Sequence, residues 1–68
     1  MLMRRCDARR CRRRIRSGYL MCREHWYMVP PELRVEVLDA YRAEGVASER
    51  YQAARKAAID AVEEALAA

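Results

Sequence analysis

The chain has 68 residues and a formal net charge of +4, and no apolar run approaches the ~20 residues needed to cross a bilayer. Three cysteines cannot all pair internally, and the N-terminus lacks the apolar segment of a secretory signal. We therefore expect one cytoplasmic domain over 1–68 that does not contact membranes, where clustered cysteines more often bind metal than form disulfides.

The hydrophobic core of such a short chain is too small to stabilise the fold by itself. A domain of this size buries only about 60% of its unfolded surface. Apolar residues make up 53% of the chain, but 12 of them are alanine and there is no phenylalanine. The composition therefore predicts an added stabilising element, such as a metal ion or a partner chain.

Positive charge is concentrated at the front of the chain. Residues 1–25 hold nine arginines against Asp7 and Glu24, whereas residues 26–68 carry three more acidic than basic side chains. This asymmetry indicates that the front end meets nucleic acid or an acidic partner. The arginines expected to make that contact are Arg4, Arg5, Arg9, Arg10, Arg12, Arg13, Arg14 and Arg16.

The three cysteines and the single histidine have the spacing of metal ligands. They are Cys6, Cys11, Cys22 and His25, in the pattern C-x4-C-x10-C-x2-H. Three thiolates and one imidazole are donors that tetrahedral structural zinc favours, so we predict one bound Zn²⁺. The alternative is that the cysteines are small buried hydrophobic residues and that the histidine lies on the surface. An iron–sulfur cluster fits this donor set less well.

The segment between the second and third cysteines predicts a β-hairpin. RRRIRSGYLM, residues 12–21, has two short arms around Ser17-Gly18. A cysteine knuckle, a hairpin and a ligand pair on a following turn resemble a treble-clef zinc site, although four residues rather than the commoner two separate the first cysteine pair. The predicted basic zinc-binding module spans residues 1–29.

Residues 30–68 predict an antiparallel helical hairpin packed on that module. One helix is expected over Pro31–Glu44, because proline suits a first helical turn and Gly45 suits a terminator. A second is expected over Glu49–Leu66 with Ser48 as its N-cap. Because apolar residues lie on more than one side of the first helix, we expect it to be covered by both the zinc module and the second helix. The fold class is thus a small zinc-stabilised α+β domain. Tyr41 and Tyr51 are expected in the hairpin core.

The residues give little support to catalysis. Four protein ligands would leave the metal no open coordination position, so hydrolytic zinc chemistry is not expected. Glu24 lies beside the ligands but is better explained as a solvated charge or the partner of an arginine. We therefore predict that the protein is not an enzyme.

The run LMCREHWYMVP at residues 20–30, with Leu33, AYR at 40–42, Tyr51 and AAIDAV at 57–62, resembles a family of small zinc-finger-like proteins. They are encoded by bacteriophages and actinobacteria, are largely uncharacterised, and share a Cys-x-x-His-Trp motif followed by two helices. The resemblance implies metal ligation by the three cysteines and His25, and a location in the host cytoplasm if the chain is phage-encoded. It also implies that Trp26 and Pro30 are structural supports.

Two functions remain open. The first is non-sequence-specific contact with nucleic acid through arginines around the zinc module, since the guanidinium fork suits phosphate. The second is docking on a host or bacterial protein as an inhibitor or adaptor, and the helices offer a further surface for a homodimer. Trp26 is expected to pack over the metal site and against Val35 or Leu38, with stacking on a nucleic-acid base as the alternative.

Overall fold

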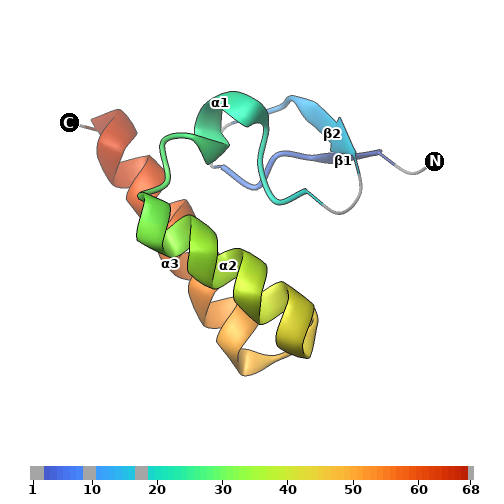
Figure 1. Cartoon of the computed structure of the whole chain (residues 1–68). Helices are drawn as coiled ribbons and strands as arrows, with labels where there is room; N and C mark the ends of the chain where they lie inside the picture. The colour runs from blue at the N-terminus through green and yellow to red at the C-terminus, as the bar shows by residue number, and fades with distance from the viewer. Residues whose placement is uncertain (1–2, 9–10, 17–18, 68) are drawn as a thin grey trace.

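The computed structural model describes residues 3–8, 11–16 and 19–67. Within these residues the chain forms two strands and three helices (Figure 1). The strands and the first helix lie together across one end of a pair of long antiparallel helices. In chain order the elements are β1 (Met3–Arg5), β2 (Arg14–Arg16), α1 (Arg23–Trp26), α2 (Pro31–Glu44) and α3 (Glu49–Ala67).

The two strands form a small antiparallel sheet. Arg4 pairs with Ile15 and Arg5 with Arg14. Because successive side chains point to opposite faces, Ile15 is buried while Arg14 and Arg16 on either side of it are exposed. The backbone N–H of Cys6 donates to the carbonyl of Arg13 over 2.9 Å, which extends the pairing toward the loop between the strands.

The predicted hairpin has the right first arm but the wrong partner. Arg14–Arg16 is a strand, yet it pairs with Met3–Arg5 and not with the residues after Gly18. Leu20 and Met21 lie outside any strand and are both buried. Two adjacent residues of one strand cannot bury their side chains on the same face, so a non-strand segment is the better solution here. The turn itself, Ser17-Gly18, lies outside the described residues.

The helical hairpin follows the local signals in the sequence. α2 begins at Pro31 and ends before Gly45, whose φ of 81° is in the left-handed region that favours glycine. The hydroxyl of Ser48 accepts the backbone N–H of Tyr51 over 3.0 Å, as an N-cap does. α3 extends to Ala67, one residue beyond the predicted end. An antiparallel helical hairpin at the predicted positions is therefore confirmed.

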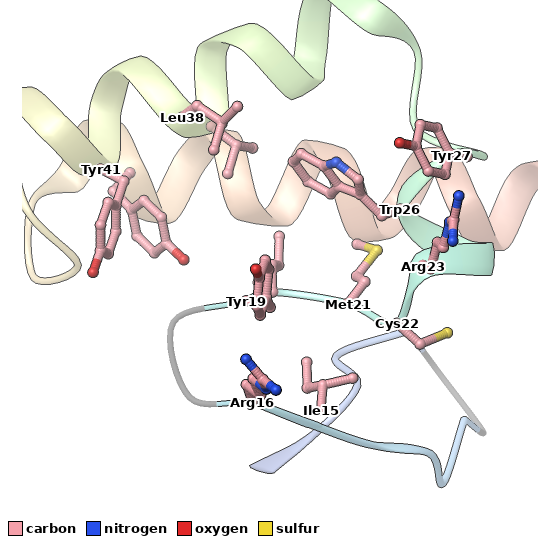
Figure 2. A pocket seen from close by; sticks show the side chains of 13 residues that line it. Ile15, Arg16, Tyr19, Met21, Cys22, Arg23, Trp26, Tyr27, Leu38 and Tyr41 are labelled. Atoms are coloured by element: carbon pink, nitrogen blue, oxygen red, sulfur yellow. The ribbon is translucent and has the colours of Figure 1, made fainter. Parts of the chain in front are cut away.

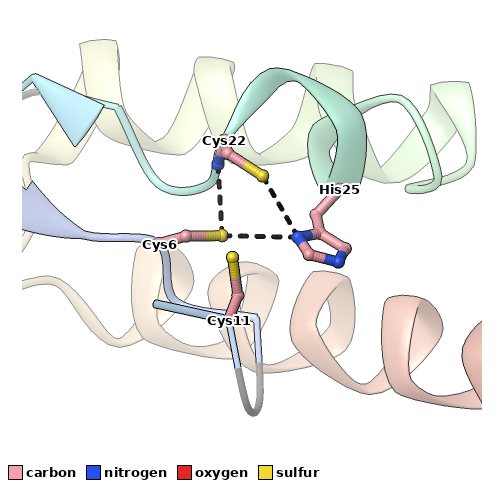
Figure 3. A group of neighbouring side chains, drawn as sticks. All are labelled: Cys6, Cys11, Cys22 and His25. Carbon is pink, nitrogen blue, oxygen red and sulfur yellow. Dashed lines mark hydrogen bonds between the residues drawn. The ribbon is translucent and has the colours of Figure 1, made fainter. Parts of the chain in front are cut away.

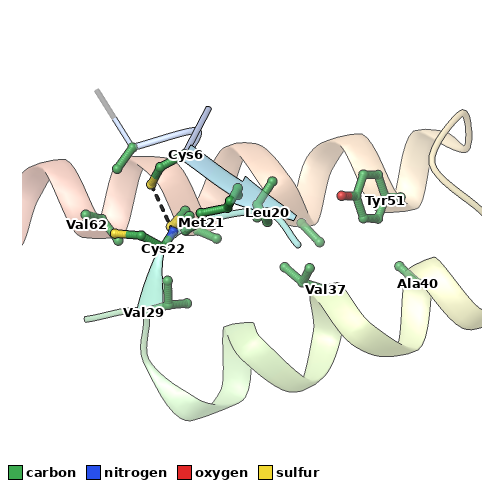
Figure 4. Close-up of a cluster of buried hydrophobic side chains, with 13 residues drawn as sticks. Cys6, Leu20, Met21, Cys22, Val29, Val37, Ala40, Tyr51 and Val62 are labelled. Atoms are coloured by element: carbon green, nitrogen blue, oxygen red, sulfur yellow. Dashed lines mark hydrogen bonds between the residues drawn. The ribbon is translucent and has the colours of Figure 1, made fainter. Parts of the chain in front are cut away.

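The core lies between α2, α3 and the front end of the chain (Figure 4). Small side chains let the two helices approach closely, and Ala40 and Ala58 are completely buried. The front end contributes Leu20, Met21 and Val29 to the same cluster. The helices and the front end thus share one core, so each depends on the other.

One side of α2 stays uncovered by the described chain. α2 meets both α3 and the front end, as expected, but Val35 and Leu38 are exposed. Tyr41 retains 45% of its exposure, so the expectation that it is a core residue is wrong. Tyr51 is buried as predicted, and its ring lies 6.0 Å from that of Tyr41. α3 also meets both neighbours: it packs on α2 and reaches the loop between the strands through Arg55. No helix among the described residues is long and apolar enough to cross a membrane.

Candidate metal centre

Four side chains from three separate segments meet at one point (Figure 3). Cys6 directly follows β1, and Cys11 comes from the loop that leads to β2. Cys22 is the N-cap residue of α1, and His25 lies in that helix. Their sulfur and nitrogen atoms are all within 4.8 Å of one another, and all three cysteines are free thiols. The structure therefore brings together the complete predicted ligand set.

The separations suit a tetrahedral metal site. With Zn–S near 2.3 Å and Zn–N near 2.0 Å, tetrahedral donors lie about 3.5–3.8 Å apart. Nδ1 of His25 lies 3.7 Å from the sulfur of Cys6, within this range. It lies 3.1 Å from the sulfur of Cys22, slightly closer than a shared metal requires.

Short-range backbone structure holds the donors in place. Cys22 and His25 are three residues apart on one helical turn, which places both on the same side of α1. The carbonyl of Cys22 accepts the N–H of Trp26 over 2.9 Å, which closes this turn. The backbone N–H of Cys22 also donates to the sulfur of Cys6 over 3.1 Å. Hydrogen bonds of this kind orient ligands and stabilise negative charge on sulfur.

The thiols differ in their tendency to ionise. Burial raises the pKa of Cys6 to about 11, although backbone N–H groups of Cys22 and Ala8 oppose the shift. Burial also raises the pKa of Cys22, but a hydrogen bond from the His25 backbone and the neighbouring thiols outweigh it, so the net pKa lies below the ordinary value. Cys22 is therefore the readier thiolate, and a cation has to displace a proton from Cys6.

Asp7 is a supporting residue that the sequence analysis did not single out. Its carboxylate is only 13% exposed and accepts hydrogen bonds from Arg4 of β1 and Arg55 of α3, the latter over 3.0 Å. Its backbone N–H donates to the carbonyl of Leu20 over 3.0 Å. One residue thus connects the cysteine loop to a strand, to the segment before α1 and to a long helix. Asp7 is the only acidic residue between the first two cysteines, and this position in the sequence could have identified it as a supporting residue.

Trp26 and Pro30, expected to be structural supports, lie at the two ends of the segment between α1 and α2. Trp26 is half-buried against the core and shares a cavity with Leu38, whereas Val35 is not among the residues that line that cavity. Pro30 is the N-cap residue of α2, and its carbonyl accepts the backbone N–H groups of Leu33 and Arg34. Both residues therefore contribute to how α1 is joined to the helical hairpin.

The predicted basic residues separate into two groups. Arg4 pairs with Asp7, and Arg13 pairs with Glu24 over 2.9 Å. Among the described residues no ion pair involves the other exposed members, and Arg9 and Arg10 lie outside that part of the chain. Of the predicted residues that the structure describes, those that are exposed and have no ion pair are Arg5, Arg12, Arg14 and Arg16.

Comparison with known proteins adds no relative. No protein-family model, no curated protein and no solved structure matches this chain.

Proposed function

We propose that Cys6, Cys11, Cys22 and His25 bind one Zn²⁺ ion whose role is structural. The proposal is supported by the convergence of their four donor atoms within 4.8 Å and by the free state of the three thiols. Three sulfurs and one imidazole nitrogen match the ligand preference of zinc. With all four positions supplied by protein, the ion would connect the loop between the strands to α1 and have no site for substrate.

The proposed site is not catalytic. Glu24 lies between two of the ligands in the sequence, but its carboxylate is paired with Arg13 and both side chains are 62% exposed. A general base needs to lie within hydrogen-bond reach of a reacting group. Glu24 is instead exposed to solvent and held by Arg13, so it is not placed against a reacting group. This arrangement supports the inference that the protein is not an enzyme.

We further propose that the zinc module binds the phosphate backbone of nucleic acid. The observation that carries this proposal is the cross-strand pair of Arg5 and Arg14, which are directly opposed and both exposed. Like charges at opposed positions destabilise a sheet unless an anion lies between or over them. With Arg12 and Arg16 they form the arginine face of the hairpin, defined as Arg5, Arg12, Arg14 and Arg16. Each guanidinium can donate two hydrogen bonds to a phosphate.

The test is a salt titration of binding to random duplex and single-stranded DNA. Four neutralised phosphates predict a log–log slope of about −4 for duplex DNA, because each contributes about −0.9. The double variant Arg5→Gln/Arg14→Gln should reduce the magnitude of that slope by about 2. Arg42→Gln, an exposed arginine at the far end of α2, is the matched control and should leave the slope unchanged.

Two results would contradict the nucleic-acid proposal. One is a lack of binding to any DNA or RNA at low salt by metal-loaded protein. The other is an affinity that the paired arginine variant and the control variant change equally.

A protein partner is the second candidate, and a specific observation favours it. Val35 and Leu38 remain exposed on α2, and a helix face of this kind can pack on another helix or on a second copy of the chain. The arginine face would then suit an acidic patch beside it. Binding that persists at high salt and is lost in Leu38→Asp would support protein docking or a homodimer over nucleic-acid contact.

A further inference from the structure

All the aromatic side chains of the protein line one cavity. The sequence contains four tyrosines, one tryptophan and no phenylalanine. The cavity has a volume of about 560 Å³ and opens between α2 and the segment that leads into α1 (Figure 2). This volume is within the range of about 300–1,000 Å³ typical of sites that hold small ligands. The aromatic residues that line it are Tyr19, Trp26, Tyr27, Tyr41 and Tyr51.

Several of these rings are open to an incoming ligand. Tyr19 is 63% exposed, and Tyr41 lies across the cavity from it on α2. The indole of Trp26 points from α1 into the space below Leu38 (Figure 2). One face of Tyr27 is already covered by the guanidinium of Arg34, 5.2 Å from the ring centre, so this ring is less available. Tyr19, Trp26 and Tyr41 therefore form the accessible set.

The charge around the cavity is positive. Arg16 and Arg23 line it from β2 and α1, and none of the described residues that line it is acidic. Arg16 also belongs to the arginine face, so the cavity adjoins the surface proposed to hold phosphates. The sulfur of Cys22 is directed away from the cavity, toward the other metal ligands (Figures 2 and 3). The cavity and the metal centre thus use opposite sides of the same segment.

We infer that this cavity binds unpaired bases of single-stranded nucleic acid, which stack on its aromatic rings while Arg16 and Arg23 hold the flanking phosphates. The inference rests on the proposed function and makes it more specific. Proteins that bind single strands combine a basic groove with aromatic side chains, because every base offers a π-face. Bases within a duplex are already stacked and cannot enter, so the cavity distinguishes single strands from duplex.

The single tryptophan provides a direct measurement. Metal-loaded protein is titrated with a short oligothymidine, with the same strand as a duplex, and with an abasic strand of equal phosphate content, and Trp26 fluorescence is followed. The oligothymidine should quench Trp26 and bind about 5- to 150-fold more tightly than the abasic strand, as expected for stacking of one base. Duplex and abasic strands should bind through the arginine face with little change in fluorescence.

Variants locate the effect. Tyr19→Leu should weaken oligothymidine binding by about 5- to 150-fold and leave the salt slope and the affinity for duplex unchanged. Its exposed position means that the fold should tolerate the change, and circular dichroism checks this. Val46→Ala alters an exposed apolar side chain between α2 and α3 that does not line the cavity, and it should have no effect.

The possible failures are distinguishable. Equal affinities for oligothymidine and abasic strand, with no response of Trp26, would overturn the inference while the proposed function survived. No binding of any nucleic acid at low salt would end both. Quenching of Trp26 by an acidic amphipathic peptide but not by oligothymidine, or by self-association seen in sedimentation, would assign the cavity to a protein or to a second copy. The comparison of oligothymidine with the abasic strand uses the wild-type protein. It therefore tests base stacking even if the Tyr19 variant misfolds.

Discussion

At the scale of single residues, the metal centre depends on how readily each thiol loses its proton. Cys22 is prepared for ionisation by the backbone N–H of His25, whereas Cys6 is held protonated by its burial. A cation bound between them reverses the effect of burial, because its charge stabilises both thiolates. The same burial that makes Cys6 a poor thiolate alone would also shield a bound ion from water.

This difference predicts how metal affinity changes with pH. Zinc affinity, measured by competition with a chromophoric chelator, should rise steeply between pH 6 and 8, because each protonated thiol releases one proton on binding. As pH passes the lowered pKa of Cys22 the slope should decrease by about one proton. It should not reach zero below pH ~11, because Cys6 with a pKa of about 11 still has a proton to release. A pH-independent affinity over this range would show that these thiols are not the ligands.

The stability of the metal-free protein should fall as pH rises, whereas zinc affinity rises. A group whose pKa is raised by folding stabilises the folded state below its unfolded pKa and loses that contribution as pH rises through its folded pKa. For Cys6 that window runs from about 9 to about 11. Only the metal-free form should lose stability there.

At the scale of elements, the turn between α2 and α3 sets the geometry of the helical pair. Gly45 ends α2 with a positive φ, and Ser48 both donates to the Gly45 carbonyl over 3.0 Å and caps α3. Across the pair, Arg50 of α3 donates to Glu36 and Glu44 of α2. These exposed ion pairs add little stability, so the cap and the alanine contacts dominate.

The cap can be tested directly. Ser48→Ala removes the acceptor for the Tyr51 N–H and should lower the free energy of unfolding by about 1 kcal/mol. In a domain of this size that corresponds to a decrease in Tm of about 4–8 °C. Ser48→Asp is the matched control, because its carboxylate can accept the same hydrogen bond, and should retain most of the stability. Equal melting temperatures of the alanine variant and the wild type would show that the cap does not stabilise the protein.

At the scale of the whole molecule, metal site and core are parts of one structure. Cys6 and Cys22 belong to the same buried cluster as Val29 and as Val62 of α3. Structural zinc contributes about 10–16 kcal/mol in small fingers, comparable with or above the ~5–15 kcal/mol stability of a whole domain. Without the ion, repulsion among the arginines of the front end would be opposed only by the shared core and the ion pairs of Asp7.

We therefore expect chelation to destabilise the front end. After stoichiometric removal of zinc, amide hydrogen exchange should become faster over residues 3–8, 11–16 and 19–26, and the thermal transition should shift downward. The double variant Cys6→Ser/Cys22→Ser should behave like the chelated protein, and restored zinc should rescue only the wild type. Unchanged exchange and melting in protein shown to be metal-free would refute a structural role for the ion.

The bounds of the two long helices, to within one residue, and the membership of the candidate ligand set were predictable from the sequence. Pro31, Gly45 and Ser48 act through interactions within a few residues of themselves, so their positions alone indicate where helices begin and end. The ligands were identifiable because the chain contains only three cysteines and one histidine, and their spacing suits a tetrahedral ion.

Other features were decided only by tertiary structure. The partner of strand Arg14–Arg16, the bridging position of Asp7 and the gathering of every aromatic ring at one cavity all join segments far apart in the chain. These long-range contacts form because the arrangement that contains them buries Leu20 and Met21 and keeps charged groups solvated or paired. Local pattern carries no information about that competition, because the alternatives have the same local propensities and differ only in their long-range contacts.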